Sequence, residues 1–216
     1  MKSNPNRYIC IEGNIGAGKT TLCQMIALEH DCKVILEEFA ENPFLEYFYR
    51  DQARYAFPVE LFFLSERQKQ LELEAIQTDL FYKFFISDYS ILKSLLFARS
   101  NLSPEEYKLF YKIYHALTIN IPKPDLILYL HRETEHVQRN IVNRGRLFEN
   151  DITTEYLHKI QESYFDFFKS QFVIPVVVAD LNDQDFTKDS RIFQEIENIL
   201  FTKFTPGLHH IKIINQ

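Results

Sequence analysis

The sequence predicts an α/β fold in which a five-stranded parallel sheet is flanked by helices on both faces. Five short apolar runs rich in β-branched and aromatic residues begin near residues 8, 34, 84, 126 and 173, and segments with helical spacing separate them. The runs are continuously apolar instead of alternating, which is typical of strands buried on both faces. Strands that alternate with helices favour a parallel sheet covered on both sides.

The expected elements can be assigned in chain order. The strands are 8–11, 34–36, 84–88, 126–130 and 173–178, and the helices are 20–30, 42–75 with a break at Pro58, 103–120, 134–144, 154–170 and 190–204. One helix start is well marked, because Ser103 is a suitable N-cap and Pro104 suits the first helical position. A chain of 216 residues fits one domain. We expect residues 1–205 to form it and residues 206–216 to be a tail of unknown role, either unstructured or docked.

Composition excludes several classes of protein. The net charge is −6 at pH 7, whereas nucleic acids and anionic membranes attract basic proteins. No apolar run approaches the roughly 18–20 residues of a membrane span, and the polar first residues do not resemble a secretory signal. The three cysteines have no metal-site spacing. We therefore expect reduced thiols in a cytoplasmic protein without a cysteine metal site.

The segment after the first expected strand predicts a phosphate-binding loop. Residues 13–20 match the P-loop pattern G-x-x-x-x-G-K-[ST] in full, between a strand and a helix. The glycines allow backbone N–H groups to point at phosphate oxygens, and the helix start adds its positive end. Lys19 can reach the β- and γ-phosphates of ATP, and the Thr20 hydroxyl can join a Mg²⁺ shell. The expected ATP-binding residues here are Gly13, Asn14, Ile15, Gly16, Ala17, Gly18, Lys19, Thr20 and Thr21.

Acidic residues follow the second and third expected strands. Ligands of open α/β sheets bind beyond the carboxyl ends of the strands, where Glu37, Glu38 and Asp88 are expected. We assign Glu37 as the general base for an attacking hydroxyl, and Asp88 as the acid that holds Mg²⁺, directly or through water. Glu38 is the alternative base, since only one of the two side chains can point inward. Either acid could instead cap the helix that follows it.

Arginines cluster around Gly145 between two expected helices. Arg144 and Arg146 flank this glycine, and Arg139 lies one turn earlier. Phosphoryl transfer needs positive charge over the migrating group, which arginines on a closing loop can supply. We therefore predict an arginine lid that contacts ATP. The alternative is a basic helix end that interacts with the helix dipole.

Taken together, these segments resemble the deoxynucleoside kinase family, and within it the bacterial deoxyguanosine and deoxyadenosine kinases, over about residues 7–200. The resemblance implies that Glu37 is the catalytic base, that Tyr49 and Glu149 contact the sugar 3′-hydroxyl, and that Glu60 and Arg67 read the base. It also assigns Asp88 to the acceptor site, residues 144–146 to the lid, and the loop with Asp185 and Phe186 to the ATP adenine. A homodimer packed through helices is implied as well.

The sequence departs from the family pattern at four positions. Glu38 replaces a proline, Tyr89 replaces the arginine that usually follows the acid at position 88, and Asn140 stands where a lid-helix arginine is common. The fourth departure is Glu60, where many relatives have glutamine. The missing arginine at position 89 implies that another group takes over its task near the 5′-hydroxyl.

Glu60 favours guanine over adenine for a physical reason. An ionised carboxylate only accepts hydrogen bonds, and guanine offers two adjacent donors, N1–H and the 2-amino group. Arg67 could then donate to guanine O6 and N7, and an aromatic residue could stack on the base, the candidates being Tyr47, Phe62, Phe63 and Tyr82. The alternative is that Glu60 bonds Arg67, seven residues further along the same helix, and reads no base.

The sequence thus predicts an ATP- and Mg²⁺-dependent enzyme that phosphorylates the 5′-hydroxyl of a purine deoxynucleoside, with deoxyguanosine favoured and deoxyadenosine next. One alternative is a nucleoside monophosphate kinase, for which Arg50, Arg54 and Arg99 could bind the acceptor phosphate. The other is a P-loop module that binds a nucleotide for regulation and has no acceptor.

Overall fold

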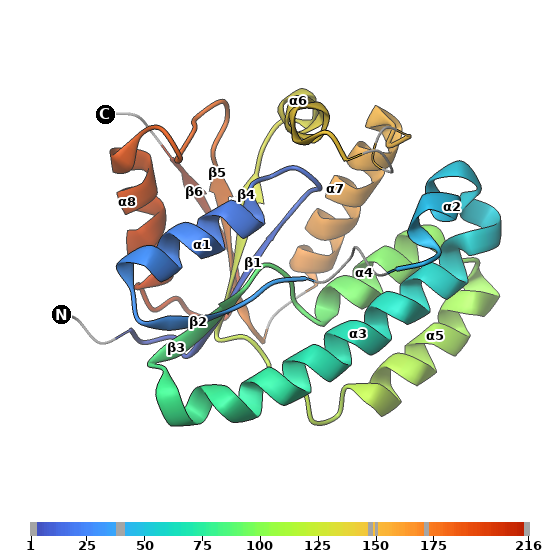
Figure 1. Cartoon of the computed structure of the whole chain (residues 1–216), viewed down its shortest axis with the longest axis horizontal. Helices are drawn as coiled ribbons and strands as arrows, with labels where there is room; N and C mark the ends of the chain where they lie inside the picture. The colour runs from blue at the N-terminus through green and yellow to red at the C-terminus, as the bar shows by residue number, and fades with distance from the viewer. Residues whose placement is uncertain (1–3, 38–41, 147–148, 150, 171–172, 214–216) are drawn as a thin grey trace.

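The computed structural model of the chain describes residues 4–37, 42–146, 149, 151–170 and 173–213, with only the backbone described for 75–81 (Figure 1). The strands in these residues are β1 (Tyr8–Gly13), β2 (Cys32–Ile35), β3 (Phe84–Ser87), β4 (Leu126–His131), β5 (Pro175–Asp180) and β6 (Gly207–Lys212). The helices are α1 (Lys19–Glu29), α2 (Leu45–Arg50), α3 (Gln52–Phe81), α4 (Leu92–Asn101), α5 (Pro104–Leu117), α6 (Thr134–Arg144), α7 (Thr154–Lys169) and α8 (Ser190–Leu200).

The strands form one sheet in the order β2-β3-β1-β4-β5-β6, and every neighbouring pair is parallel. β1 lies between β3 and β4, and all six of its residues are buried. Because the strands run in the same direction, their carboxyl ends meet at one edge of the sheet. The segments that follow β1, β2 and β3 therefore come together there.

Helices cover both faces of the sheet, as the sequence predicts. In Figure 1, α3, α4, α5 and α7 form one group, and α1 lies beside α8 in another. His30 after α1 contacts Glu197 of α8 (Nε2 to Oε1, 2.5 Å), and its ring lies 4.5 Å from that of Phe201. Helix α6 lies at the carboxyl edge, where Asn140 Nδ2 donates to the carbonyl of Gly16 at 2.8 Å. Helix α6 therefore covers the edge of the sheet that carries the P-loop.

The sheet has six strands, so the expected number of five is wrong. The additional strand, β6, comes from the segment expected to be a tail, and it pairs in register with β5 from Gly207 to Lys212. Ile213 is fully buried, and its N–H donates to the carbonyl of Asp180 at 3.0 Å. The two histidines in this short run obscure its strand character, because they interrupt the apolar residues Leu208 and Ile211.

Two helical expectations also need correction. The break in the long helical segment lies at Asp51, since α3 continues through Pro58. The N–H of Asp51 donates to the carbonyl of Tyr47 and ends α2, and the side chain of Asp51 accepts a hydrogen bond from the N–H of Arg54 in α3. Asp51 therefore separates the two helices. Helix α4 was not expected. The predicted start of α5 is confirmed, because Ser103 and Glu106 form a reciprocal capping box.

Helix α3, with 30 residues, is the longest of the described helices. Length alone does not make a membrane span, since a span must also be strongly apolar. None of the described helices is both long and apolar enough to cross a membrane.

The buried end of β6 gives a direct test of the sixth strand. Ile213→Ala removes a fully buried side chain, and we expect it to lower the free energy of unfolding by about 2–5 kcal/mol. Lys212→Ala, which changes the exposed neighbour, is the matched control and should stay within about 0.5 kcal/mol of the parent. Urea unfolding followed by circular dichroism measures both. Equal stability of the two variants would mean that β6 does not dock.

Candidate active site

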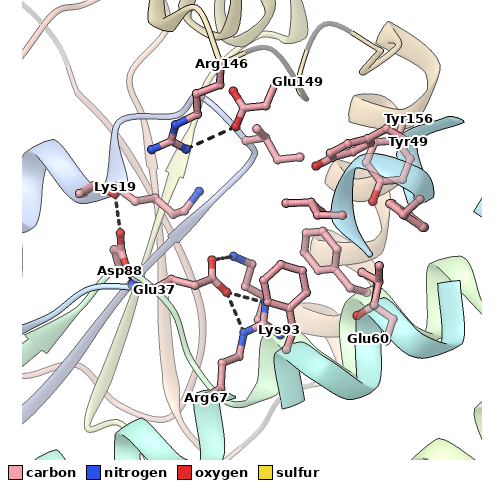
Figure 2. Close-up of a pocket in the computed structure, with 18 of the residues that line it drawn as sticks. Lys19, Glu37, Tyr49, Glu60, Arg67, Asp88, Lys93, Arg146, Glu149 and Tyr156 are labelled. Atoms are coloured by element: carbon pink, nitrogen blue, oxygen red, sulfur yellow. Dashed lines mark hydrogen bonds and ion pairs between the residues drawn. The ribbon is translucent and has the colours of Figure 1, made fainter. Parts of the chain in front are cut away.

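Two cavities at the carboxyl edge of the sheet share a wall. The residues that line both are Gly16, Lys19, Thr20, Arg144 and Arg146. The first cavity (Figure 2) is further lined by Ile15, Glu37, Leu45, Phe48, Tyr49, Val59, Glu60, Phe63, Arg67, Asp88, Lys93, Phe97, Glu149 and Tyr156. The second is further lined by Gly18, Thr21, His136, Asn140, Asn143, Asp185, Phe186 and Thr187. A chemical group bound at the shared wall could therefore be transferred from a molecule in one cavity to a molecule in the other.

The shared wall is built on the turn between β1 and α1. Gly16 and Gly18 have φ angles of +83° and +99°, in the left-handed region that favours glycine. A Cβ atom on Gly18 would also lie 3.1 Å from the ring of Phe186. No side chain caps the start of α1. A phosphate site needs the first N–H groups of a helix to be free of such a cap, so that they can donate to phosphate oxygens.

Lys19 is the cation of this turn. Its Nζ donates to the carbonyls of Gly13 and Asn14 at 3.0 and 2.9 Å. Burial and the charge of Lys93 lower the pKa of Lys19 to about 8. Lys19 therefore still carries its positive charge at neutral pH in a site where few water molecules can screen it.

Asp88 connects the turn to the segment after β2. Its Oδ2 accepts a hydrogen bond from the Thr20 hydroxyl, and its Oδ1 accepts one from the N–H of Glu37 at 2.7 Å. A hydroxyl and a carboxylate beside a phosphate site are the oxygen ligands that Mg²⁺ takes, together with substrate phosphates and water. Thr20 and Asp88 therefore fit a Mg²⁺ ion.

Glu37 lies between two cations. Its Oε1 contacts Arg67 Nη2 at 2.5 Å and accepts from Arg67 Nε at 2.7 Å, and its Oε2 contacts Lys93 Nζ at 2.5 Å. Burial alone would raise the pKa of Glu37, but the charges of Arg67 and Lys93 outweigh it and lower this pKa to about 2. Figure 2 shows the three side chains together beneath Lys19. Glu37 is thus a charged, oriented carboxylate next to the phosphate turn.

The two arginines expected in a lid contact the same carboxylate. Arg144 makes a bidentate contact with Glu149, with Nη2 2.6 Å from Oε1 and Nε 3.1 Å from Oε2, and Arg146 Nη1 lies 3.4 Å from Oε1. Gly145, with φ +68°, ends α6 between them. Arg139 is exposed and contacts Asp183 outside both cavities. The structure therefore brings two of the three expected arginines to the shared wall.

The far end of the first cavity holds a second carboxylate, Glu60. Its Oε1 accepts from Asn101 Nδ2 at 2.8 Å, whereas Glu60 Oε2 and Asn101 Oδ1 are buried without a hydrogen-bond partner within the described residues. Burial raises the pKa of Glu60 to about 7, although the hydrogen bond from Asn101 opposes this shift. The alternative contact between Glu60 and Arg67 is absent from the described contacts, because Arg67 contacts Glu37 and Ser94 instead.

Aromatic rings enclose this cavity between Glu60 and Glu149. Tyr49 and Tyr156 meet edge to face with their centroids 6.3 Å apart, and burial raises the pKa of both hydroxyls above the usual range. Of the four aromatic residues expected to stack on a base, Phe63 lines the cavity, whereas Tyr47, Phe62 and Tyr82 do not. The cavity therefore combines flat apolar walls with acidic groups at both ends.

The second cavity contains the loop after β5. Asp185 accepts from the Thr187 hydroxyl at 2.6 Å, a bond that contributes most to lowering the pKa of Asp185 to about 2. Phe186 is buried, and the Arg132 guanidinium lies 5.7 Å from the centre of its ring. Asp185 and Phe186 thus lie near the P-loop, as the sequence predicts.

Several residues of the two cavities escaped the sequence analysis, namely Leu45, Phe48, Val59, Lys93, Phe97, Tyr156, His136, Asn143 and Thr187. Lys93 had a detectable signal, because it is the one charged residue in the largely apolar run 91–98. Arg50, Arg54 and Arg99, considered for an acceptor phosphate, line neither cavity. Glu38, the alternative base, lies outside the described residues.

Comparison with known proteins identifies the family. The model of the deoxynucleoside kinase family matches residues 9–204. The chain belongs to the deoxynucleoside kinase family. It is 36% identical over 200 residues to a deoxyguanosine kinase of Bacillus subtilis strain 168, covering 89% of this chain and 95% of that protein. It is 29% identical to a deoxyadenosine/deoxycytidine kinase of the same strain, covering 90% of each.

Solved structures agree with this deoxynucleoside kinase assignment. The structure of a deoxyadenosine kinase from M. mycoides with bound dCTP superposes with a TM-score of 0.75 at 25% identity, covering 89% of this chain and 99% of that one. The predicted family and the predicted α/β fold are therefore confirmed. A kinase needs a donor site and an acceptor site that meet, which is the arrangement of the two cavities.

The environment of Glu60 predicts how the stability of this deoxynucleoside kinase depends on pH. The pKa of Glu60 is raised from 4.5 in the unfolded chain to about 7 in the folded one, so the folded state loses stability as the pH rises between these values. Glu60→Gln carries no ionisable group. We expect its free energy of unfolding to exceed that of the parent by an amount that grows from pH 4.5 to 7, up to about 3 kcal/mol, and then stays constant.

Urea unfolding at several pH values measures this difference. Glu72→Gln, at an exposed position of the same helix, is the control and should show no such growth. A difference between Glu60→Gln and the parent that is independent of pH would contradict the raised pKa of Glu60.

Proposed function

We propose that this deoxynucleoside kinase phosphorylates the 5′-hydroxyl of deoxyguanosine, and less efficiently that of deoxyadenosine, with ATP and Mg²⁺ in nucleoside salvage. The observation that carries the base preference is the buried Oε2 of Glu60 at the end of the first cavity, which has no hydrogen-bond partner among the described residues. The similarity to a deoxyguanosine kinase over most of both chains supports the same choice.

The base preference follows from the carboxylate at that end of the cavity. Glu60 Oε2 lacks a partner within the described residues, and Glu60 Oε1 accepts from Asn101 Nδ2. Guanine would present N1–H and the 2-amino group to this carboxylate, whereas adenine would present the lone pair of N1. A site that leaves buried polar groups unpaired with the wrong ligand discriminates strongly. Phe63 would stack on the base.

The other residues of the acceptor cavity suit a deoxyribose. Tyr49 and Glu149 would bind the 3′-hydroxyl, which places the 5′-hydroxyl toward Glu37 and the shared wall. Glu37 would accept the proton of the 5′-hydroxyl, which can then attack the γ-phosphorus. Because this carboxylate stays ionised over the whole neutral range, it is available as a base in every enzyme molecule.

The phosphates of ATP would lie along the P-loop. Residues 13–21 would surround them with backbone N–H groups and Lys19, and Asp185 and Phe186 would contact the adenosine. Thr20 and Asp88 would hold Mg²⁺, which neutralises charge on the β- and γ-phosphates when bound. Arg144 and Arg146 would stabilise the charge that develops on the transferred group.

A nucleoside monophosphate kinase is less well supported. Its acceptor cavity needs a cation for the acceptor's own phosphate, in addition to those that serve the donor. The cations of the first cavity that do not also line the second are Arg67 and Lys93, and both contact Glu37. An acceptor phosphate would have to compete with this carboxylate.

We also propose a cytoplasmic homodimer. Cys10, Cys23 and Cys32 are buried and form no disulfide, as suits a reducing compartment. Helix α5 exposes Leu109 and Tyr111, which would be covered if two copies packed through their helices, as the family resemblance implies.

The assay that tests this function measures ADP release with ATP and each of six nucleosides: the four deoxynucleosides, adenosine and guanosine. We expect deoxyguanosine to give the highest kcat/KM and deoxyadenosine the next highest. Glu37→Gln should bind deoxyguanosine but lose at least about a hundredfold in kcat, in line with the usual contribution of general-base catalysis. ADP release with dGMP but with none of the nucleosides would favour the monophosphate kinase.

The base preference has its own test. Glu60→Gln gives the side chain a donor as well as an acceptor, which suits adenine. We expect the ratio of kcat/KM for deoxyguanosine to that for deoxyadenosine to fall by at least about tenfold, since one good hydrogen bond to a charged group contributes about 1.5–3 kcal/mol. Glu72→Gln is again the control and should keep the parent ratio. An unchanged ratio in Glu60→Gln would mean that Glu60 does not read the base.

A further inference from the structure

Lys93 is a buried cation that lines the acceptor cavity and contacts Glu37. Its Nζ lies 2.5 Å from Glu37 Oε2, its side chain is 9% exposed, and it lies 5.5 Å from the centre of the Phe97 ring. Desolvating an ammonium group is costly unless an opposite charge compensates. Burial beside the Phe97 ring and the ion pair with Glu37 therefore both keep the Lys93 ammonium group at the carboxylate.

The other cation on Glu37 has a second potential role. Arg67 lies on α3 with Glu60, and the proposed function uses both to read the base. If Arg67 turns toward a bound guanine, it weakens its contact with Glu37. Lys93 lies on α4, one residue into that helix, and has no part in base reading. Of the two cations, Lys93 is thus the one that can stay on Glu37 throughout the reaction.

Position 89 cannot supply this charge. Tyr89 stands where the family has an arginine, and it is fully buried with its hydroxyl donating to Gln70 Oε1 at 2.6 Å, outside the cavity lining. The side chain of Asp88 points into the cavity, and the next residue in an extended chain points to the opposite side. A cation beside Glu37 must therefore come from another element.

We propose that Lys93 is the positioning residue that holds the Glu37 carboxylate directed at the acceptor hydroxyl, in place of the arginine absent from position 89. In the reaction, the 5′-hydroxyl proton moves to a Glu37 oxygen while the 5′-oxygen forms a bond to the γ-phosphorus. The bond between this phosphorus and the β,γ-bridging oxygen breaks, and its electron pair leaves on ADP. Lys93 acts through Glu37 by fixing the orientation of its carboxylate, without contacting the phosphates.

This inference rests on the proposed function, and its test uses the full-length enzyme with deoxyguanosine and ATP. In Lys93→Met we expect kcat at pH 7.5 to fall at least tenfold with the KM for ATP within twofold of the parent. Because an arginine can keep the ion pair with Glu37, Lys93→Arg should restore most of kcat.

Lys33→Met is the matched control. It removes the half-buried ion pair of Lys33 with Glu74, whose atoms lie 2.9 Å apart, away from both cavities. It should leave kcat and both KM values unchanged. A kcat of Lys93→Met close to that of the parent, or a loss of kcat that Lys93→Arg does not restore, would overturn the proposal.

The same assays separate failure of this inference from failure of the proposed function. Absence of ADP release with every nucleoside would refute the proposed function. Parent-like kcat in Lys93→Met would refute only the role of Lys93.

Discussion

The candidate site depends on one carboxylate that joins two parts of the sheet edge. Asp88 follows β3 and accepts one hydrogen bond from Thr20 at the start of α1 and another from the backbone of Glu37 after β2. The parallel strands bring these segments together, but they do not fix the distance between them. Asp88 does so with its two oxygens, and Thr20 and Glu37 are therefore held in one arrangement at the turn between β1 and α1.

Two other carboxylates show how the same residue type acquires different chemistry from its surroundings. Glu37 and Glu60 are both buried in one cavity, and burial favours the protonated form of each. Two cations reverse this effect at Glu37, whereas Glu60 is left with the amide of Asn101. The pKa of one carboxyl of the cavity is thus lowered and that of the other is raised, although both are buried. Opposite shifts within one cavity are typical of functional sites.

Much of this arrangement could be predicted because it depends on local pattern. The P-loop is encoded by three closely spaced glycines and Lys19, and the parallel order of strands brings Glu37 and Asp88 to the same edge. The contacts of Arg67 and Lys93 could not be predicted, since they join α3 and α4 across the cavity and depend on how these helices pack. The predicted number of strands was wrong for a similar reason. An edge strand such as β6 is fixed by pairing with β5, and its own sequence pattern is weak.

Helix α6 connects the turn between β1 and α1 with the arginines at its own C-terminal end. Asn140 of this helix bonds the carbonyl of Gly16, and a Cβ atom on Gly16 would lie only 2.7 Å from the carbonyl of Val137, so the helix packs directly on the turn. The same helix ends at Arg144, whose charge is balanced by Glu149 in the acceptor cavity. Phosphoryl transfer leaves the protein little to do besides positioning and charge stabilisation. A single helix that contacts the donor turn at one point and ends at the acceptor cavity fixes the relative positions of the two reacting molecules, which is where most of that positioning is needed.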